Sequence, residues 1–529
     1  MKKRSITAIL LACFIIMLPS CMNEEQRTST AVDREQLFDY IIEKTRVREA
    51  MSPVKMEMMN YDPIEEMLKY RDEMIAAERD MELISVLMKI SNARRDRHLS
   101  VSPTDGGLVI DAETDQIAPV IFRVDYTVED EYFFFVGDYA KNIADLSGGT
   151  TPDLGDKLVG VNEEPVNSYF EMMRPYFRYS SIKGLWKSFA EDLNARNYNF
   201  PPTLVNENIL YELEKRDGTV YQITLPYLDP DSVNWLDTYK SHGENRYTGF
   251  ELLLDRETFD VYTSGEHENL LLIDWYGFQN DLVEDMDFLM EYASENDMLG
   301  YDIIWDGTRS RGGSKGAYAV QRLFPQPFKT TFGNLKISDV IPLFIEEREE
   351  SYKRRTQMLD AGVTESEDDG TWLIEWLRSD VTDAINNGDE YSNNVPFKLA
   401  HLPKDSDGII HPAEKHFGGK AVCLFGPFGG SHLDQFASIV IDNNLAYSIG
   451  MSAGGYSNTW EWDEILMFPV SGKPVARFMW DIGHTIRPNG EILEGNPAIV
   501  DKYIPEGRDN YLNYYDILLD EAFKFLDKQ

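Results

Sequence analysis

Two serines near the end of the chain stand in settings that could make them nucleophiles. The first is Ser452, at the centre of a G-x-S-x-G pattern in the stretch GMSAG. That pattern exposes a reactive serine only when a strand precedes it and a helix follows it. The strand is there, as LAYSIG, but the following AGGYSNTWEWDEILMFPV does not begin a helix. We therefore expect Ser452 to be structural.

Ser431 stands in the setting that Ser452 lacks. An apolar strand, AVCLFG, and the turn PFGG precede it, and apolar residues at helical spacing follow it. These residues are Leu433, Phe436, Ala437, Val440 and Ile441. A serine at a helix N-terminus can cap the helix by accepting an N–H hydrogen bond. The same N–H groups also stabilise an oxyanion, so position alone leaves capping and catalysis open.

The rest of the chain divides by pattern into helical, β-rich and α/β regions. Residues 34–100 are predicted to be helical, because their apolar side chains recur at helical spacing. Residues 101–230 favour short strands, and GDKLVGVNEEPVNSYFEMM has the turn–strand–turn–helix shape of a PDZ-like module. Residues 245–331 and 418–529 alternate buried strands with helices, and 332–417 is predicted to be an insertion between them. We expect a multidomain α/β protein.

The first residues resemble a bacterial lipoprotein signal. After a basic start and an apolar run, the chain reads LPSC, with Leu18 three residues before Cys21 and a small residue between. The resemblance implies removal of residues 1–20, lipidation of Cys21 and an acidic tether at 21–33. We therefore expect a lipid-anchored protein of the bacterial cell envelope, in the outer membrane and facing the periplasm or the surface. An ordinary secretory signal is the alternative.

The composition of the chain argues against some classes of binding partner and some kinds of site. The formal net charge of −40 argues against binding to nucleic acid or to anionic lipid headgroups. Of the three cysteines, Cys13 lies in the signal and Cys21 is the expected lipidation site, which leaves Cys423. We expect neither an intrachain disulfide nor a cysteine-based metal site, and no motif suggests a metal or an organic cofactor.

Five segments, in one order along the chain, resemble the C-terminal processing (tail-specific) serine peptidases. They are RDRHLSV, the strand and glycine loop GYDIIWDGTRSRGGS, the nucleophile segment GPFGGSHLDQFASIV, the following IGMSAGG, and GEILEGNPAIVD. The PDZ-like module is in the family's place, and the likeness covers about residues 35–525. The resemblance implies a ClpP/crotonase-like α/β peptidase domain and makes GMSAGG a loop downstream of the nucleophile helix.

The chain is more similar to the tricorn-like branch, and to chlamydial protease-like activity factor, than to the branch with a serine–lysine dyad. A dyad with the spacing of that branch is excluded, because no lysine occurs from Gly430 to Gly472. The resemblance implies that Ser431 is the nucleophile and His98 the general base. It also implies that Glu494 orients the imidazole and stabilises its charged form.

The resemblance further implies an oxyanion hole made of backbone N–H groups. They belong to His432 and to Gly312 or Gly313. Alternatives stay open for two roles: either of two nearby carboxylates could replace Glu494, and a second histidine is a reserve base. These residues are Glu491, Asp501 and His484.

The chain also departs from the family pattern. Ser310 or Arg311 stands where the family's glycine loop has an asparagine, and the S-A-x-E motif has become SHLD. These changes allow a different specificity or a loss of catalysis. We expect a membrane-anchored serine endopeptidase acting on proteins or peptides. The alternatives are a non-catalytic peptide- or ligand-binding lipoprotein on the same fold, and a lipase or esterase that uses Ser452.

Overall fold

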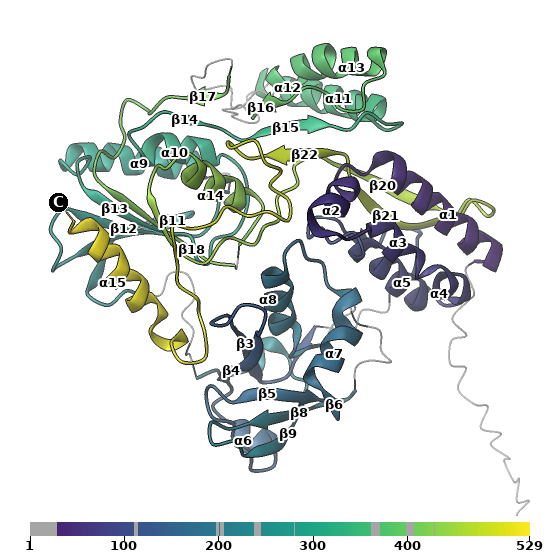
Figure 1. The fold of residues 1–529 in the computed structure, drawn as a ribbon, viewed down its shortest axis with the longest axis horizontal. Coiled ribbons are helices and arrows are strands. Elements are labelled where there is room, and N and C mark those ends of the chain that lie inside the picture. Colours follow the sequence, from purple (N-terminus) through teal and green to yellow (C-terminus); the bar gives the residue numbers. More distant parts are fainter. Residues whose placement is uncertain are drawn as a thin grey trace, which may run out of the picture.

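The computed structural model describes residues 29–528 apart from 111–114, 197–199, 201–205, 237, 239–244, 280, 361–370, 398–406 and 428 (Figure 1). The signal segment, Cys21 and most of the tether lie outside the described residues. Among the residues that are described, no helix is both long and apolar enough to cross a bilayer.

Five helices begin the described chain, and four of them, all but the second, share one apolar core with a hairpin from the far end of the chain (Figure 1). The helices are α1 (Ala31–Arg48), α2 (Met51–Met59), α3 (Pro63–Leu68), α4 (Arg71–Ala76) and α5 (Asp80–Asn92). The hairpin is β20 (Glu461–Met467) with β21 (Pro474–Asp481), and β21 also pairs with β1 (Val101–Ser102). Helix α5 buries Leu83, Leu87 and Ile90, the spacing expected of a helix with one apolar face.

The β-rich module forms its own sheet around an aromatic core. The sheet contains β3 (Val120–Asp125), β4 (Phe133–Tyr139), β5 (Lys157–Val161), β6 (Glu164–Pro165), β8 (Asn208–Glu214) and β9 (Val220–Pro226). Around it lie α6 (Ile143–Leu146), α7 (Val166–Met173), η1 (Arg174–Tyr176), α8 (Ile182–Asp192), η3 (Pro230–Ser232) and the pair β2 (Gln116–Ile117) and β7 (Ala195–Arg196). Trp186 of α8 stacks on Phe134 and Phe170, so α8 closes the core of the module.

A seven-stranded sheet between helices carries the nucleophile segment. In spatial order its strands are β10 (Phe250–Asp255), β11 (Phe259–Ser264), β12 (Leu270–Trp275), β13 (Asp302–Asp306), β18 (Ala421–Phe425), β19 (Tyr447–Gly450) and β23 (Lys502–Tyr503). From β12 onward the strands are parallel, whereas β10, β11 and β12 are antiparallel.

The two faces of this sheet are covered by different helices (Figure 1). On β12, Leu271 and Ile273 pack into the core beneath α9 (Leu282–Glu295), α10 (Gly316–Leu323) and α14 (His432–Asp442). Leu270 and Leu272 face the other core, beneath α15 (Tyr514–Leu526), which follows the short turn η5 (Tyr511–Asn513). This alternation is what a strand buried on both faces requires.

Residues 332–417 form a region that is connected to the C-terminal segment through a small sheet. Strand β15 (Phe332–Leu335) pairs with β16 (Val395–Pro396) and with β22 (Gly483–Ile486), and β14 (Phe328–Lys329) pairs with β17 (Ile409–Ile410). Its helices are α11 (Ile341–Asp360), α12 (Thr371–Trp376), the π-helical turn η4 (Leu377–Val381) and α13 (Thr382–Asn387). The mixed multidomain α/β fold class predicted from the sequence is confirmed.

Candidate active site

Ser431 occupies a strained turn between strand β18 and helix α14. Its backbone has φ 59° and ψ −125°, a region that residues other than glycine avoid unless the surroundings impose it. The Ser431 N–H donates to the carbonyl of Tyr456, which holds the backbone in this conformation. The preceding Gly430 packs so closely on the Tyr456 ring that a Cβ there would lie 2.1 Å from it. The hydroxyl of Ser431 makes no capping hydrogen bond to α14. The capping interpretation of this serine is therefore wrong.

The hydroxyl of Ser431 instead faces His98. Nε2 of His98 lies 3.0 Å from Oγ of Ser431, although 333 residues separate the two in the chain. His98 follows helix α5, and its backbone N–H donates to Oδ1 of Asp96 at 2.9 Å, which fixes the turn. Burial lowers the pKa of the imidazole, and the nearby Asp96 carboxylate opposes part of that shift.

The other ring nitrogen of His98 is an acceptor. The backbone N–H of Asn458 donates to Nδ1 at 3.3 Å, a long hydrogen bond. A neutral imidazole that accepts at Nδ1 carries its proton on Nε2 and so donates to Ser431. This is the opposite tautomer from the one that a general base needs.

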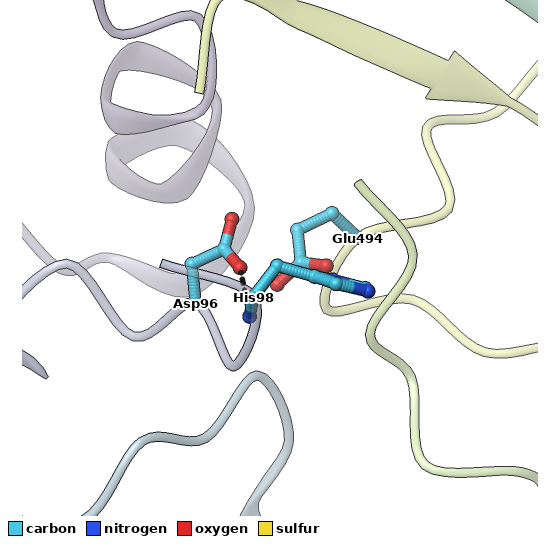
Figure 2. A group of neighbouring side chains, drawn as sticks. All are labelled: Asp96, His98 and Glu494. Atoms are coloured by element: carbon cyan, nitrogen blue, oxygen red, sulfur yellow. Dashed lines mark hydrogen bonds between the residues drawn. The ribbon is translucent and has the colours of Figure 1, made fainter. Parts of the chain in front are cut away.

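Glu494 lies beside His98 but no hydrogen bond joins the two among the described residues. Oε2 of Glu494 accepts from the backbone N–H of Ser457 at 2.9 Å, and Oε1 lies 3.7 Å from Nζ of Lys55. One donor atom each from Asp96, His98 and Glu494 nevertheless fall within 4.8 Å of one another (Figure 2). Burial, then the charge of Asp96, raises the pKa of Glu494 above its ordinary value, and the nearby Lys55 opposes part of that shift.

The glycine loop after β13 lies against the nucleophile. A Cβ on Gly312 would stand 2.6 Å from Cβ and 3.1 Å from Oγ of Ser431, so only glycine lets the two backbones approach this closely. Gly313 has φ 148° and forms an isolated bridge with Phe278. His432 is the first residue of α14, where a backbone N–H has no partner within the helix.

Three solved structures of one protein resemble this chain over nearly its whole length. Mature CPAF aligns with a TM-score of 0.67 at 14% identity, over 92% of this chain and 96% of that chain. Mature CPAF complexed with lactacystin aligns with a TM-score of 0.67 at 15% identity, over 94% of this chain and 98% of that chain. The chain has the CPAF fold. A CPAF mutant gives 0.65 at 13% identity, over 94% and 97%. No protein-family model and no curated protein matches the chain.

The CPAF fold explains why the early histidine and the late serine meet. Helices α1, α3, α4 and α5 share a core with the hairpin β20–β21, and the segment that leads into that hairpin contains Asn458, which contacts His98. The likeness to a CPAF-like member of the tail-specific peptidases, stated from five short motifs, is thus supported at the level of the fold.

The reserve residues from the sequence lie elsewhere. Ser452 sits in a loop, and the next regular element after it is strand β20. Nε2 of His484 lies 3.1 Å from the carbonyl of Ala50. Glu491 bonds to Arg487 and its own loop, and Asp501 accepts from Ser448. These sets do not converge on Ser431.

Three residues near the site were not assigned a role from the sequence. Lys55 is buried and donates from Nζ to the carbonyls of Arg94 at 2.9 Å and Arg95 at 2.8 Å, which holds the turn before His98. Asn458 contacts Nδ1 of His98 as described above. Asp434, which stands at the family's acidic position, accepts from the N–H groups of Gly455 and Tyr456. It therefore supports the loop that binds the Ser431 N–H.

The second histidine of the nucleophile segment points away from Ser431. Nε2 of His432 accepts from the Gly316 N–H at 2.6 Å, at the start of α10. Burial lowers the pKa of His432 to about 4, which keeps it neutral and able to accept. His432 therefore contributes its backbone, not its ring, to the surroundings of Ser431.

Proposed function

We propose that this protein is a serine endopeptidase with Ser431 as nucleophile, His98 as general base and Glu494 as the carboxylate partner of the imidazole. The observation that carries the proposal is the 3.0 Å contact between Nε2 of His98 and Oγ of Ser431. It is supported by the strained backbone of Ser431, because such strain persists mainly at functional sites.

The reaction proceeds through an acyl-enzyme. His98 takes the proton of Ser431 as Oγ attacks the peptide carbonyl, and the oxyanion forms next to the N–H groups of His432 and Gly312. His98 then gives the proton to the leaving amine, and water repeats the sequence on the ester. Because burial lowers the pKa of His98, its imidazole is neutral at pH 7 and available as a base.

The base form of His98 requires a local rearrangement. Nε2 must present a lone pair to Ser431, so the ring proton must lie on Nδ1. That N–H group then needs a carboxylate oxygen as its hydrogen-bond acceptor. Oε1 of Glu494 has no hydrogen-bond donor among the described residues and is a near neighbour of the ring. We infer that Glu494 turns to accept from Nδ1 when substrate binds, displacing the long contact from Asn458.

The proposed location rests on the lipoprotein signal at the start of the sequence, and the proposed substrates rest on the resemblance to peptidases. Lipidation of Cys21 would tether the peptidase to a membrane of the cell envelope by a short acidic stalk. The substrates are proteins or peptides of that compartment. The PDZ-like module would hold an extended segment of the substrate by adding it to a strand edge.

A non-catalytic, peptide-binding protein on the same fold is the competing function. It is favoured by one observation: the Nδ1 contact with Asn458 leaves His98 in the tautomer that donates to Ser431. If the tautomer did not change on substrate binding, the serine would remain unactivated.

A fluorophosphonate probe followed by peptide mapping separates these functions. Under the proposal the wild-type protein is labelled on Ser431, and the Ser431→Ala variant is unlabelled and has no peptidase activity. The Ser452→Ala variant is the matched control and should be labelled like wild type. Absence of any label supports the binding protein, and label on Ser452 supports an esterase.

A further inference from the structure

The turn that carries His98 lies in a buried cluster of charges in which carboxyl groups outnumber the available cations. Asp96, Asp481 and Glu494 are each at most 1% exposed. Of the buried cations, Arg94 pairs with the Glu49 carboxylate and Lys55 lies near Glu494. Lys336, by contrast, donates to the Glu49 backbone carbonyl and is attracted by Asp481. With Glu49 included, four buried carboxyl groups of this cluster therefore stand against three buried cations in the described part of the chain. An excess of negative charge in such surroundings is costly unless protons or a cation balance it.

Two oxygen atoms of this cluster lack hydrogen-bond donors. They are Oδ2 of Asp96 and Oε1 of Glu494, which have no donor in hydrogen-bonding geometry within the described part of the chain. The Ser180 hydroxyl nevertheless lies near the Glu494 carboxyl group and opposes the rise in its pKa. Nζ of Lys55 lies 3.7 Å from Oε1, beyond hydrogen-bonding distance, and donates to two backbone carbonyls instead. Buried carboxylate oxygens of native proteins nearly always have a partner, so these two point to something that binds between them.

The geometry suits a small cation. Donor atoms of Asp96, His98 and Glu494 lie within 4.8 Å of one another, and Figure 2 shows the two carboxyl groups entering from opposite sides of His98. Donors at about 2.1 Å from a tetrahedral zinc ion stand about 3.4 Å apart. Side-chain rotations that bring the donors together by no more than about 1.4 Å would therefore complete the site.

We propose that Asp96, His98 and Glu494 bind one Zn²⁺ ion, and that the bound ion blocks the peptidase. One imidazole nitrogen with two carboxylate oxygens is a ligand set that Zn²⁺ accepts, with water in the fourth position. His98 is partly exposed, which gives the ion a route in. The ion takes up the lone pair of His98 and the free oxygen of Glu494, so neither serves Ser431. This inhibition rests on the proposed function, whereas the binding does not.

Zinc binding is measured on full-length protein without a histidine tag and with the Ser431→Ala substitution, by competition with a chromophoric chelator. We expect one Zn²⁺ per chain, and binding at least about tenfold weaker after Asp96→Asn or Glu494→Gln. Glu491→Gln, an exposed carboxylate close to Glu494 in the chain, is the matched control and should bind like the parent. Failure to bind stoichiometric zinc, or equal binding by all variants, overturns the proposal.

If a ligand variant does not fold, the zinc ligands are identified by spectroscopy on the Ser431→Ala protein instead. X-ray absorption at the zinc edge should show oxygen ligands with one imidazole and no sulfur. A spectrum with several imidazoles places the ion elsewhere and overturns the proposal. Inhibition is then tested with the wild-type chain: saturating Zn²⁺ should slow fluorophosphonate labelling of Ser431 at least tenfold, and a chelator should restore it. If the protein binds zinc but Ser431 is never labelled, the metal site stands and the peptidase function is rejected. If Ser431 is labelled but no zinc binds, the peptidase function stands and the metal site is rejected.

Discussion

Asp434→Asn tests how the loop beyond the nucleophile helix is held in place. Asp434 is 1% exposed, and its two oxygens accept from the N–H groups of Gly455 at 3.0 Å and Tyr456 at 2.9 Å. Asparagine has one acceptor oxygen, so one of these N–H groups would face an NH₂ group and lose its bond. A buried donor left without a partner costs about 1–3 kcal/mol.

The difference in folding stability between the wild type and this variant should change with pH in a definite direction. Burial raises the pKa of Asp434 to about 7, against the opposing effect of the two N–H donors. A carboxyl group whose pKa is raised on folding makes the folded state less stable as pH rises from its unfolded value toward its folded one. Asparagine does not ionise, so the wild type should be the more stable of the two by about 1–3 kcal/mol near pH 5. This difference should fall by about 3 kcal/mol between pH 5 and pH 8, because each pH unit below the folded pKa is worth about 1.4 kcal/mol.

The assay is urea denaturation of both proteins at pH 5 and pH 8, with the exposed Asp520→Asn as a control that should follow the wild type. Because Tyr456 also accepts the Ser431 N–H, Asp434→Asn should slow labelling of Ser431 as well. A variant as stable as the wild type at pH 5, or a difference that grows toward pH 8, would refute this account of the loop.

Three further predictions concern the same site. Gly430→Ala should abolish labelling of Ser431, because its Cβ would stand 2.1 Å from the Tyr456 ring, whereas Gly265→Ala, with nothing within 4 Å, should have no effect. In chelator-treated enzyme the acidic limb of the kcat/KM profile should lie below pH 6.5, since the neutral form of His98 is the base and burial lowers its pKa; a limb above pH 6.5 would be inconsistent with this. Lys55→Met should lower kcat more than it raises KM and Lys55→Arg should retain more activity, because this cation fixes the turn before His98; equal kinetics for all three proteins would remove Lys55 from the account.

The sequence was sufficient for those parts of the site that depend on local patterns. The strand and the amphipathic helix on either side of Ser431 are visible as periodicity, and they appear as β18 and α14. His98 became a candidate through the resemblance of RDRHLSV to a segment of the family, and the structure adds that Oδ1 of Asp96 accepts from the backbone N–H of His98.

Long-range contacts were beyond such patterns. The hairpin β20–β21 alternates like any strand pair, and nothing local indicates that it packs on the N-terminal helices rather than on the central sheet. From the sequence, Lys55 would be expected at the surface. It is only 1% exposed, because backbone carbonyls and Glu494, which are distant from it in the sequence, surround its side chain. The Nδ1 contact with Asn458 is also invisible in the sequence, since it uses a backbone N–H that any residue could supply.

The most direct test of the central claim is the rate at which a fluorophosphonate labels Ser431 in wild-type protein and in the His98→Ala variant. General-base assistance contributes about 10²–10⁴-fold, so the variant should react slower by that factor while remaining folded. Equal rates in the two proteins, or no reaction of the wild type at Ser431, would contradict the assignment of His98 as the base that activates this serine.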